Sequence, residues 1–225
     1  MEKPDRPTLV YFGSRGRAEV IRLVLAEAGV DWQEHHVGRG TPPSAGRPTD
    51  LGELAASGDL PFAAVPVWEE PGGFRLAQSA AIANHNARAH GLRGRDALEE
   101  ARCDELLGAV EDVRAELRKI AAAAPERRAA VREELAKVVL PRWLGFLERF
   151  LVRNGGGKGW AVGRDLTVAD LALWYVLELV RDNGLGASLP DHPALGAFAD
   201  RVASRPRIAA YLASPRRPRF VPLPT

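Results

Sequence analysis

Hydrophobic positions follow two different patterns along this chain, and the change lies near residue 91. In the first part, short apolar runs at residues 8–12 and 64–68 alternate with stretches in which apolar residues recur every three or four positions, as at 18–28. Runs of the first kind predict buried strands, and stretches of the second kind predict amphipathic helices, with Ser14 and Ser79 as N-caps. The resulting order of strand, helix, strand and then strand, strand, helix is typical of a small α/β unit.

From residue 96 onward the apolar period is helical almost throughout. Pro141 interrupts one such stretch, over residues 131–150, and is expected to bend or divide that helix. Thr167 and Asp170 have the spacing of a capping box, and a strongly apolar run follows at residues 171–180. A helix that is apolar on nearly all sides is a core helix.

The two patterns divide the chain into an α/β domain over residues 1–91, a linker at 92–95 and an all-α helical domain over 96–225. A chain of 225 residues, 46% of them apolar, can bury a sizeable core. Its 31 basic and 29 acidic residues give a net charge of +2. That excess is too small to predict a nucleic-acid partner.

Cysteine and histidine usage excludes two further kinds of chemistry. Cys103 is the only cysteine, so no intrachain disulfide forms, and the histidines lack the spacing of a metal site. No stretch reaches the roughly 20 apolar residues that cross a bilayer, and the N-terminal residues lack the apolar region of a secretory signal. We therefore expect a cytoplasmic protein with no metal and no membrane partner.

The stretch VYFGSRGR, at residues 10–17, carries the candidate chemistry of the first domain. Tyr11 lies near the end of a predicted strand, and Arg15 and Arg17 follow in the first turn of the predicted helix. Cations at a helix N-terminus oppose the helix dipole, so two arginines here favour an anionic ligand. On these residues alone, Tyr11 is either a core aromatic or a phenol directed at that ligand.

Four segments, in order, resemble the cytosolic glutathione S-transferases of the tyrosine type, with the greatest similarity to the sigma and alpha groups. YFGSRGRAEVIRLVLAEAGVDW is similar to their first strand and helix, and LPFAAVPVWEEPGGFRLAQSAAIANHNARAHGL to the segment that carries their glutathione site. LTVADLALWYVLELV and HPALGAFADRVASRPRIAAYL are similar to their C-terminal core helices. The resemblance covers nearly the whole chain. It implies a thioredoxin-like N-terminal domain followed by an all-α helical domain with a hydrophobic substrate pocket.

The resemblance also implies an activity, in which glutathione is the co-substrate and its thiolate is joined to a small apolar electrophile. Tyr11 would be the catalytic hydroxyl that hydrogen-bonds the glutathione sulfur, and Arg17 would add positive field nearby. The backbone of Val65 would pair with the cysteinyl part of the tripeptide, as an added strand at the sheet edge. Pro66 matches the cis-proline that follows it in the family.

Other matches concern the ends of glutathione, the dimer and the electrophile. Gln78 and Ser79 match the positions that hold the γ-glutamyl carboxylate, and Asp104 matches an acidic residue that reaches the ligand across a homodimer. Phe62 matches an aromatic that some classes insert into the neighbouring subunit, although a local core position fits it equally well. The electrophile pocket would include residues of both domains: Phe12, Gly13, Leu106 and Val110.

One segment departs from the family pattern. The stretch TDLGELAASGDLPF lacks the tryptophan or lysine that relatives use to hold the glycyl carboxylate, so Arg47 or Arg39 of the preceding loop is the substitute. This departure leaves another thiol, or a non-catalytic ligand-binding or structural protein on the same fold, as alternatives. Isomerase or peroxidase chemistry with the same thiolate is a third, because a fold does not determine the reaction.

Overall fold

The computed structural model describes residues 5–38 and 48–225. The chain divides into two compact units, of which the first contains the residues up to 90 and the second begins at residue 91.

The C-terminal stretch is shared between the two units. Residues 210–221 belong to the first unit and residues 222–225 to the second. The predicted division assigned this entire stretch to the helical domain. The structure differs because Tyr211 and Arg217 both bind the buried carboxylate of Glu19.

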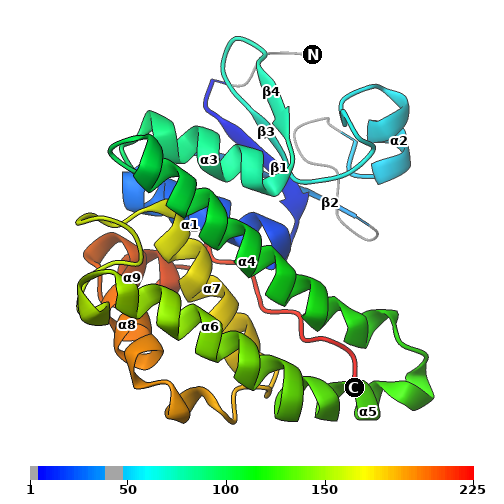
Figure 1. The fold of residues 1–225 in the computed structure, drawn as a ribbon. Coiled ribbons are helices and arrows are strands. Elements are labelled where there is room, and N and C mark those ends of the chain that lie inside the picture. Colours follow the sequence, from blue (N-terminus) through cyan, green and yellow to red (C-terminus); the bar gives the residue numbers. More distant parts are fainter. Residues whose placement is uncertain (1–4, 39–47) are drawn as a thin grey trace. The chain divides into compact units, whose positions relative to one another are not determined.

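The first unit contains a four-stranded mixed sheet with the strand order β2-β1-β3-β4 (Figure 1). The strand β1 (Thr8–Phe12) pairs in parallel with β2 (Gln33–Val37) and antiparallel with β3 (Val67–Glu69). The strand β4 (Arg75–Ala77) pairs antiparallel with β3 and completes the sheet.

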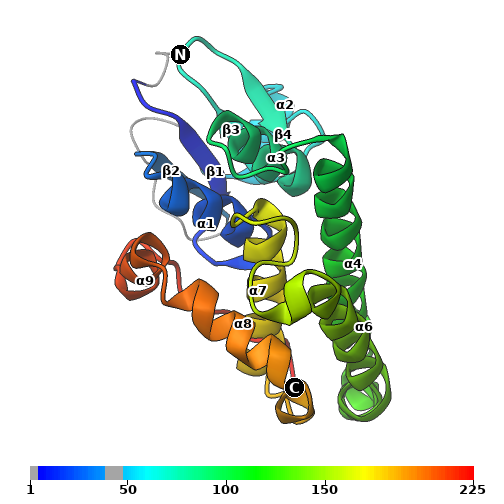
Figure 2. The same ribbon diagram turned by 60° about the vertical axis from the view of Figure 1, so that its left-hand side comes forward.

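Helices cover both faces of this sheet. The helices α1 (Glu19–Ala28) and α3 (Ser79–Ala89) contact each other and lie side by side in both ribbon views (Figures 1 and 2). The short helix α2 (Leu51–Ala56) buries Leu54 against the sheet from the other side, in a cluster of apolar residues: Val10, Val37, Leu54, Leu60, Val67 and Ala77. This arrangement confirms the predicted α/β fold class.

Both predicted serine N-caps are wrong, for local backbone reasons. The amide of Ser14 bonds to Phe12 O at 2.7 Å in a tight turn, and the helical chain starts only with the 3₁₀ turn Gly16–Ala18. Gln78, with φ of 74°, occupies the N-cap position of α3, so Ser79 is the first helical residue instead of the cap.

The second unit is helical. Its core is α7 (Val168–Asp182), which contacts α4 and α8 and is buried on nearly every side, as predicted. Its other helices, with α9 extending into the first unit, are α4 (Ala97–Ala122), α5 (Arg128–Glu134), α6 (Leu140–Arg153), α8 (Pro193–Ala203) and α9 (Pro206–Ala213).

Pro141 divides the helical stretch as predicted. It is the second residue of α6, and a π-helical turn, Leu135–Val139, precedes it. The amide of Leu140 donates to Leu135 O, one residue further back than in an α-helix. Proline has no amide hydrogen to continue the ladder, so the change of helix type falls where the ladder is interrupted.

Candidate active site

Tyr11 lies one residue before the end of β1, and its side chain is 5% exposed. Neighbouring strand residues point to opposite faces, so Tyr11 faces away from the cluster that contains Val10. Its hydroxyl oxygen accepts a hydrogen bond of 2.8 Å from the backbone amide of Arg17. A phenol accepts and donates at once, so this bond leaves the hydroxyl proton available to a ligand.

Gly16 makes this hydrogen bond possible. Its φ is 45°, a conformation that glycine adopts readily and that other residues adopt at a cost. A Cβ at this position would collide with the Tyr11 hydroxyl. It would also lie 3.1 and 3.2 Å from two carbons of the Tyr11 ring, Cε1 and Cζ. The backbone therefore passes close enough to the phenol for the next amide to reach it.

A cavity of about 230 Å³ in the first unit brings together most of the predicted glutathione residues. Its wall contains the Val65-Pro66 peptide, which is cis as the resemblance implied. Residues from the 3₁₀ turn Gly16–Ala18 to the start of α3 line it, and these are Arg17, Phe62, Ala64, Val65, Pro66, Ala77, Gln78 and Ser79.

The N-terminus of α3 lies at this cavity through Gln78 and Ser79. The first amides of a helix have no partner within the helix, and together with the helix dipole they attract anions. The helix has 11 residues, and its first turn carries no acidic side chain. The cavity therefore combines a helix N-terminus with an arginine and the cis Val65-Pro66 peptide.

Comparison with known proteins agrees with this geometry. Residues 7–88 match the model of the glutathione S-transferase N-terminal domain, and residues 111–215 match that of the C-terminal domain. Glutathione S-transferase P of Bos taurus is 35% identical over 92% of both chains. Glutathione S-transferase A1 of Mus musculus is 33% identical over 95% of this chain and 91% of its own. The chain belongs to the glutathione S-transferase family.

Solved structures give the same result for the fold of this transferase. The Pi-class glutathione S-transferase of Onchocerca volvulus superposes with a TM-score of 0.78, at 25% identity over 92% of both chains. The structure titled NaGST-2 gives a TM-score of 0.76 at 28% identity, over 93% of this chain and 97% of the other. The chain is accordingly a transferase enzyme, and glutathione conjugation is the general activity of its relatives.

Among the described residues, the other predicted site residues of the transferase, Tyr11 included, are not part of the lining of this cavity. Phe12 is 37% exposed, and Gly13 lies beside the His36 ring. Leu106 and Val110 belong to the helical unit, where both are buried. Arg47 and Arg39 lie outside the described residues.

Asp104 also belongs to the helical unit of the transferase, and its carboxylate has an intrachain partner. Both of its oxygens accept hydrogen bonds of 3.1 Å from the guanidinium of Arg93. Its side chain is still 59% exposed. The predicted role of Asp104 at the glutathione of a second subunit stays a prediction.

Sequence reasoning missed a buried arginine beside the candidate catalytic phenol. The Arg22 side chain is wholly buried, and its guanidinium lies 5.8 Å from the centre of the Tyr11 ring. It donates to the two oxygens of Glu34, at 2.9 and 3.1 Å, and to the carbonyl oxygen of Ser14 at 2.9 Å. The available signal was a charged residue within the apolar stripe of α1, next to Ile21 and Leu25.

Hydrogen bonding keeps this buried pair charged. Burial alone would raise the pKa of Glu34, but hydrogen bonds from His36, Arg22 and Trp32 lower it to about 2. The pKa of Arg22 is raised, because the attraction of Glu34 and Glu19 exceeds the effect of burial. The Arg22 guanidinium, paired with the carboxylates of Glu34 and Glu19, therefore stays charged beside the Tyr11 ring at neutral pH.

Among residues 5–38 and 48–225, no group of three or more histidine, cysteine, aspartate or glutamate side chains is placed to hold a metal ion. Within the same ranges, no helix is long and apolar enough to cross a membrane.

Proposed function

We propose that this transferase conjugates reduced glutathione to small apolar electrophiles and that the Tyr11 hydroxyl stabilises the glutathione thiolate. The observation that carries the proposal is the hydrogen bond from the Arg17 amide to the Tyr11 oxygen. This bond orients the hydroxyl and draws electron density from its oxygen. A phenol polarised in this way is a better donor to an anionic sulfur.

The proposed position of glutathione follows from the cavity. The Val65 backbone, beside cis-Pro66 on the cavity wall, would pair with the cysteinyl backbone as strands pair in a sheet. The γ-glutamyl carboxylate would lie at the N-terminus of α3, beside Gln78 and Ser79. Arg17, on the cavity wall, would supply positive charge near the sulfur.

The energy of one hydrogen bond is sufficient for this chemistry. A free thiol with a pKa of about 8.5 is only about 3% thiolate at pH 7. A hydrogen bond to a charged group contributes about 1.5–3 kcal/mol, which lowers a pKa by about one to two units. The thiolate is the nucleophile, so such a shift makes a large share of the bound glutathione reactive.

Several contacts of the proposed complex come from elsewhere in the chain. Arg47 is the proposed partner of the glycyl carboxylate, and Asp104 the proposed contact from the second subunit. In the first unit, Phe12 and Gly13 are the proposed electrophile contacts, whereas the predicted roles of Leu106 and Val110 stay predictions. The family supports a soluble protein in the cytoplasm that acts without a metal.

A pH titration of bound glutathione tests the proposal directly. We expect the ultraviolet absorbance of the thiolate to appear in the complex well below pH 8, with a glutathione-affinity resin retaining the protein. Failure to bind either the resin or free glutathione would favour a non-catalytic relative or a different thiol. Binding with an ordinary thiol pKa would exclude the activation step, and with it isomerase or peroxidase chemistry that uses the same thiolate.

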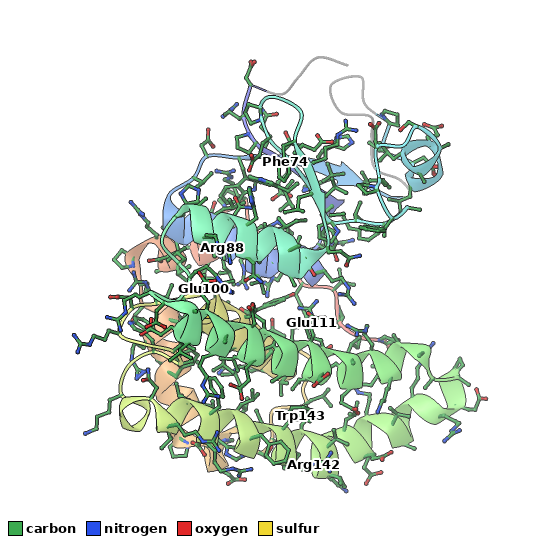
Figure 3. The ribbon with its side chains drawn as sticks, turned by 45° about the horizontal axis from the view of Figure 1, so that its top comes forward. Phe74, Arg88, Glu100, Glu111, Arg142 and Trp143 are labelled. Carbon is green, nitrogen blue, oxygen red and sulfur yellow. The ribbon has the colours of Figure 1, made fainter. Side chains whose placement is uncertain are left out.

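We also propose that the transferase is a homodimer in which Phe62 of one subunit enters the other. The Phe62 side chain is 66% exposed although it is aromatic. The helical unit contains a groove of about 250 Å³ between α4 and α6, and Trp143 lies on the α6 side of it (Figure 3). This groove, the proposed acceptor, is lined by Glu105, Leu106, Ala109, Trp143, Phe146, Leu147, Arg149, Phe150 and Arg153.

Phe62→Ala is expected to weaken the dimer about tenfold or more, because burying a phenylalanine side chain contributes about 1.5–3 kcal/mol. Sedimentation velocity over a range of protein concentrations measures the dissociation constant. Phe74→Ala is the matched control, since Phe74 is also exposed, at 47%, and lies in the same unit. Equal dissociation constants for the Phe62 variant and the wild type would exclude this contact.

A further inference from the structure

We propose that the C-terminal segment 211–220, here called the strap, holds the turn between β1 and α1 and so positions the Tyr11 hydroxyl, with Arg217 as the positioning residue. The strap begins in the last turn of α9 and is part of the red segment in Figure 1. Its contacts with the turn lie within the first unit. The functional part of this inference rests on the proposed role of Tyr11.

The hydroxyl of Tyr11 depends on the turn at residues 14–17. Its oxygen is bound by the amide of Arg17 at 2.8 Å, and Gly16 packs directly against the phenol. A displacement of this backbone therefore moves the amide away from the phenol and releases the hydroxyl from its orientation. Proton donors and acceptors need correct geometry before their pKa values matter to catalysis.

Two arginine side chains connect the turn to other segments of the first unit. The buried Arg22 donates from one nitrogen to the carbonyl oxygens of Ser14 and Arg15, at 2.9 and 3.3 Å. The side chain of Arg15 extends instead to the strap. Its Nε donates to Pro218 O at 3.2 Å, and its guanidinium lies 5.7 Å from the centre of the Phe220 ring.

The strap is anchored on a buried carboxylate. Glu19 is 0% exposed and accepts a hydrogen bond of 2.8 Å from Arg217 Nε on one oxygen. Its other oxygen accepts from the Tyr211 hydroxyl at 3.1 Å and lies 3.5 Å from Arg22. Burial and the adjacent Glu19 charge raise the pKa of Tyr211, so this hydroxyl stays a donor. A buried charge requires such partners, and removing one of them is costly.

A second contact secures the strap beside the first. Arg216 donates to Trp32 O at 2.7 Å, and its guanidinium stacks on the Trp32 ring at 4.2 Å. The indole of Trp32 in turn donates to Glu34 at 2.8 Å, the carboxylate that binds Arg22. The strap and the inner arginine thus share one network, which includes the carboxylates of Glu19 and Glu34.

Arg217→Gln tests the strap, because it removes the positive charge that pairs with Glu19 while keeping much of the side-chain length. Arg219→Gln is the matched control, since it makes the same change two residues away on an exposed side chain. Hydrogen exchange on the ligand-free protein is measured for the peptide that contains residues 14–18. We expect exchange there to be faster by about threefold or more in the Arg217 variant, with the control unchanged.

The functional consequence is measured on bound glutathione. Arg217→Gln should raise the pKa of the bound thiol by about half a unit or more, with little change in glutathione affinity. Arg217→Lys should bring this pKa most of the way back to the wild-type value. In a Tyr11→Phe background the same change should have no further effect on this pKa, because the strap acts through the hydroxyl.

The outcomes separate the strap from the proposed function. Unchanged hydrogen exchange at residues 14–18 in the Arg217→Gln variant would contradict the proposed role of the strap, independently of the pKa of bound glutathione. An ordinary pKa of the thiol bound to the wild type would contradict the proposed role of Tyr11. The exchange measurement would still decide whether the strap holds the turn. If Arg217→Gln does not fold, Phe220→Ala is the second variant, because it removes the ring that Arg15 contacts and leaves the partners of Glu19 in place. Hydrogen exchange at residues 14–18 and the pKa of bound glutathione are then measured on that variant.

Discussion

Tyr11→Phe is expected to lower kcat/KM for glutathione conjugation by about 10- to 150-fold at pH 6.5. The substitution keeps the buried ring of Tyr11 and removes only the hydroxyl that is proposed to bind the sulfur. A hydrogen bond to a charged group contributes about 1.5–3 kcal/mol, and each 1.36 kcal/mol corresponds to about a factor of ten. The pKa of the bound thiol should rise by about one to two units, while the affinity for glutathione changes little.

The measurement is the pH dependence of kcat/KM with an activated aryl halide, under conditions in which chemistry limits the rate. Tyr175→Phe is the control, because it removes the hydroxyl of a buried tyrosine in the helical unit. The loss in the Tyr11 variant should diminish at high pH, where the thiol ionises without assistance. A variant with the wild-type pH profile would show that Tyr11 is a core aromatic, the alternative that its position on a strand also allows.

Asp170→Ala is expected to destabilise the protein by about 3 kcal/mol or more, because it removes an acceptor from three buried donors. The carboxylate of Asp170 accepts hydrogen bonds from Ala161 N at 2.6 Å, Thr167 N at 2.8 Å and Thr167 Oγ1 at 2.9 Å. These bonds begin the core helix α7 and attach the preceding loop to it. A loss of this size should lower the thermal midpoint by about 6–12 °C for a chain of this length.

The pH dependence of this effect has a definite sign. Burial raises the pKa of Asp170 to about 6, and its hydrogen bonds limit that rise. Between about pH 4 and pH 6 the folded chain retains a proton that the unfolded chain has released, so the contribution of this carboxyl falls as pH rises through that window. The stability difference between wild type and Asp170→Ala should therefore be smaller at pH 7 than at pH 4.5.

Denaturant unfolding at the two pH values measures this difference. Asp165→Ala, on an exposed residue of the same loop, is the control and should change stability by less than about 0.5 kcal/mol. A stability difference that grows between pH 4.5 and pH 7 would contradict the raised pKa. Unchanged stability at both pH values would contradict the structural role of the three hydrogen bonds.

Much of the cavity beside Val65 and Pro66 could be expected from local patterns in the chain. Val65, Pro66, Gln78 and Ser79 lie close together in sequence, and the connection from β3 to α3 keeps them close in space. A proline within an apolar run already indicated an irregular or edge position. The serine caps were less predictable, because Ser14 and Ser79 both suit a cap, and the choice depends on backbone angles such as the φ of 74° at Gln78.

The features that depend on near neighbours could be read from the sequence: the strand that contains Tyr11, the capping box of Thr167 and Asp170, and the helix division at Pro141. Their physical causes are hydrophobic period, capping and a missing amide, all of which act within a few residues. Which distant side chains pair with a buried charged group depends on the tertiary structure. Glu19 meets Arg217 across 198 residues, and the stretch 210–221 belongs with the first unit instead of with the helices that precede it. Such pairings depend on how the chain brings remote segments together, since a carboxylate is buried only where folding supplies its partners.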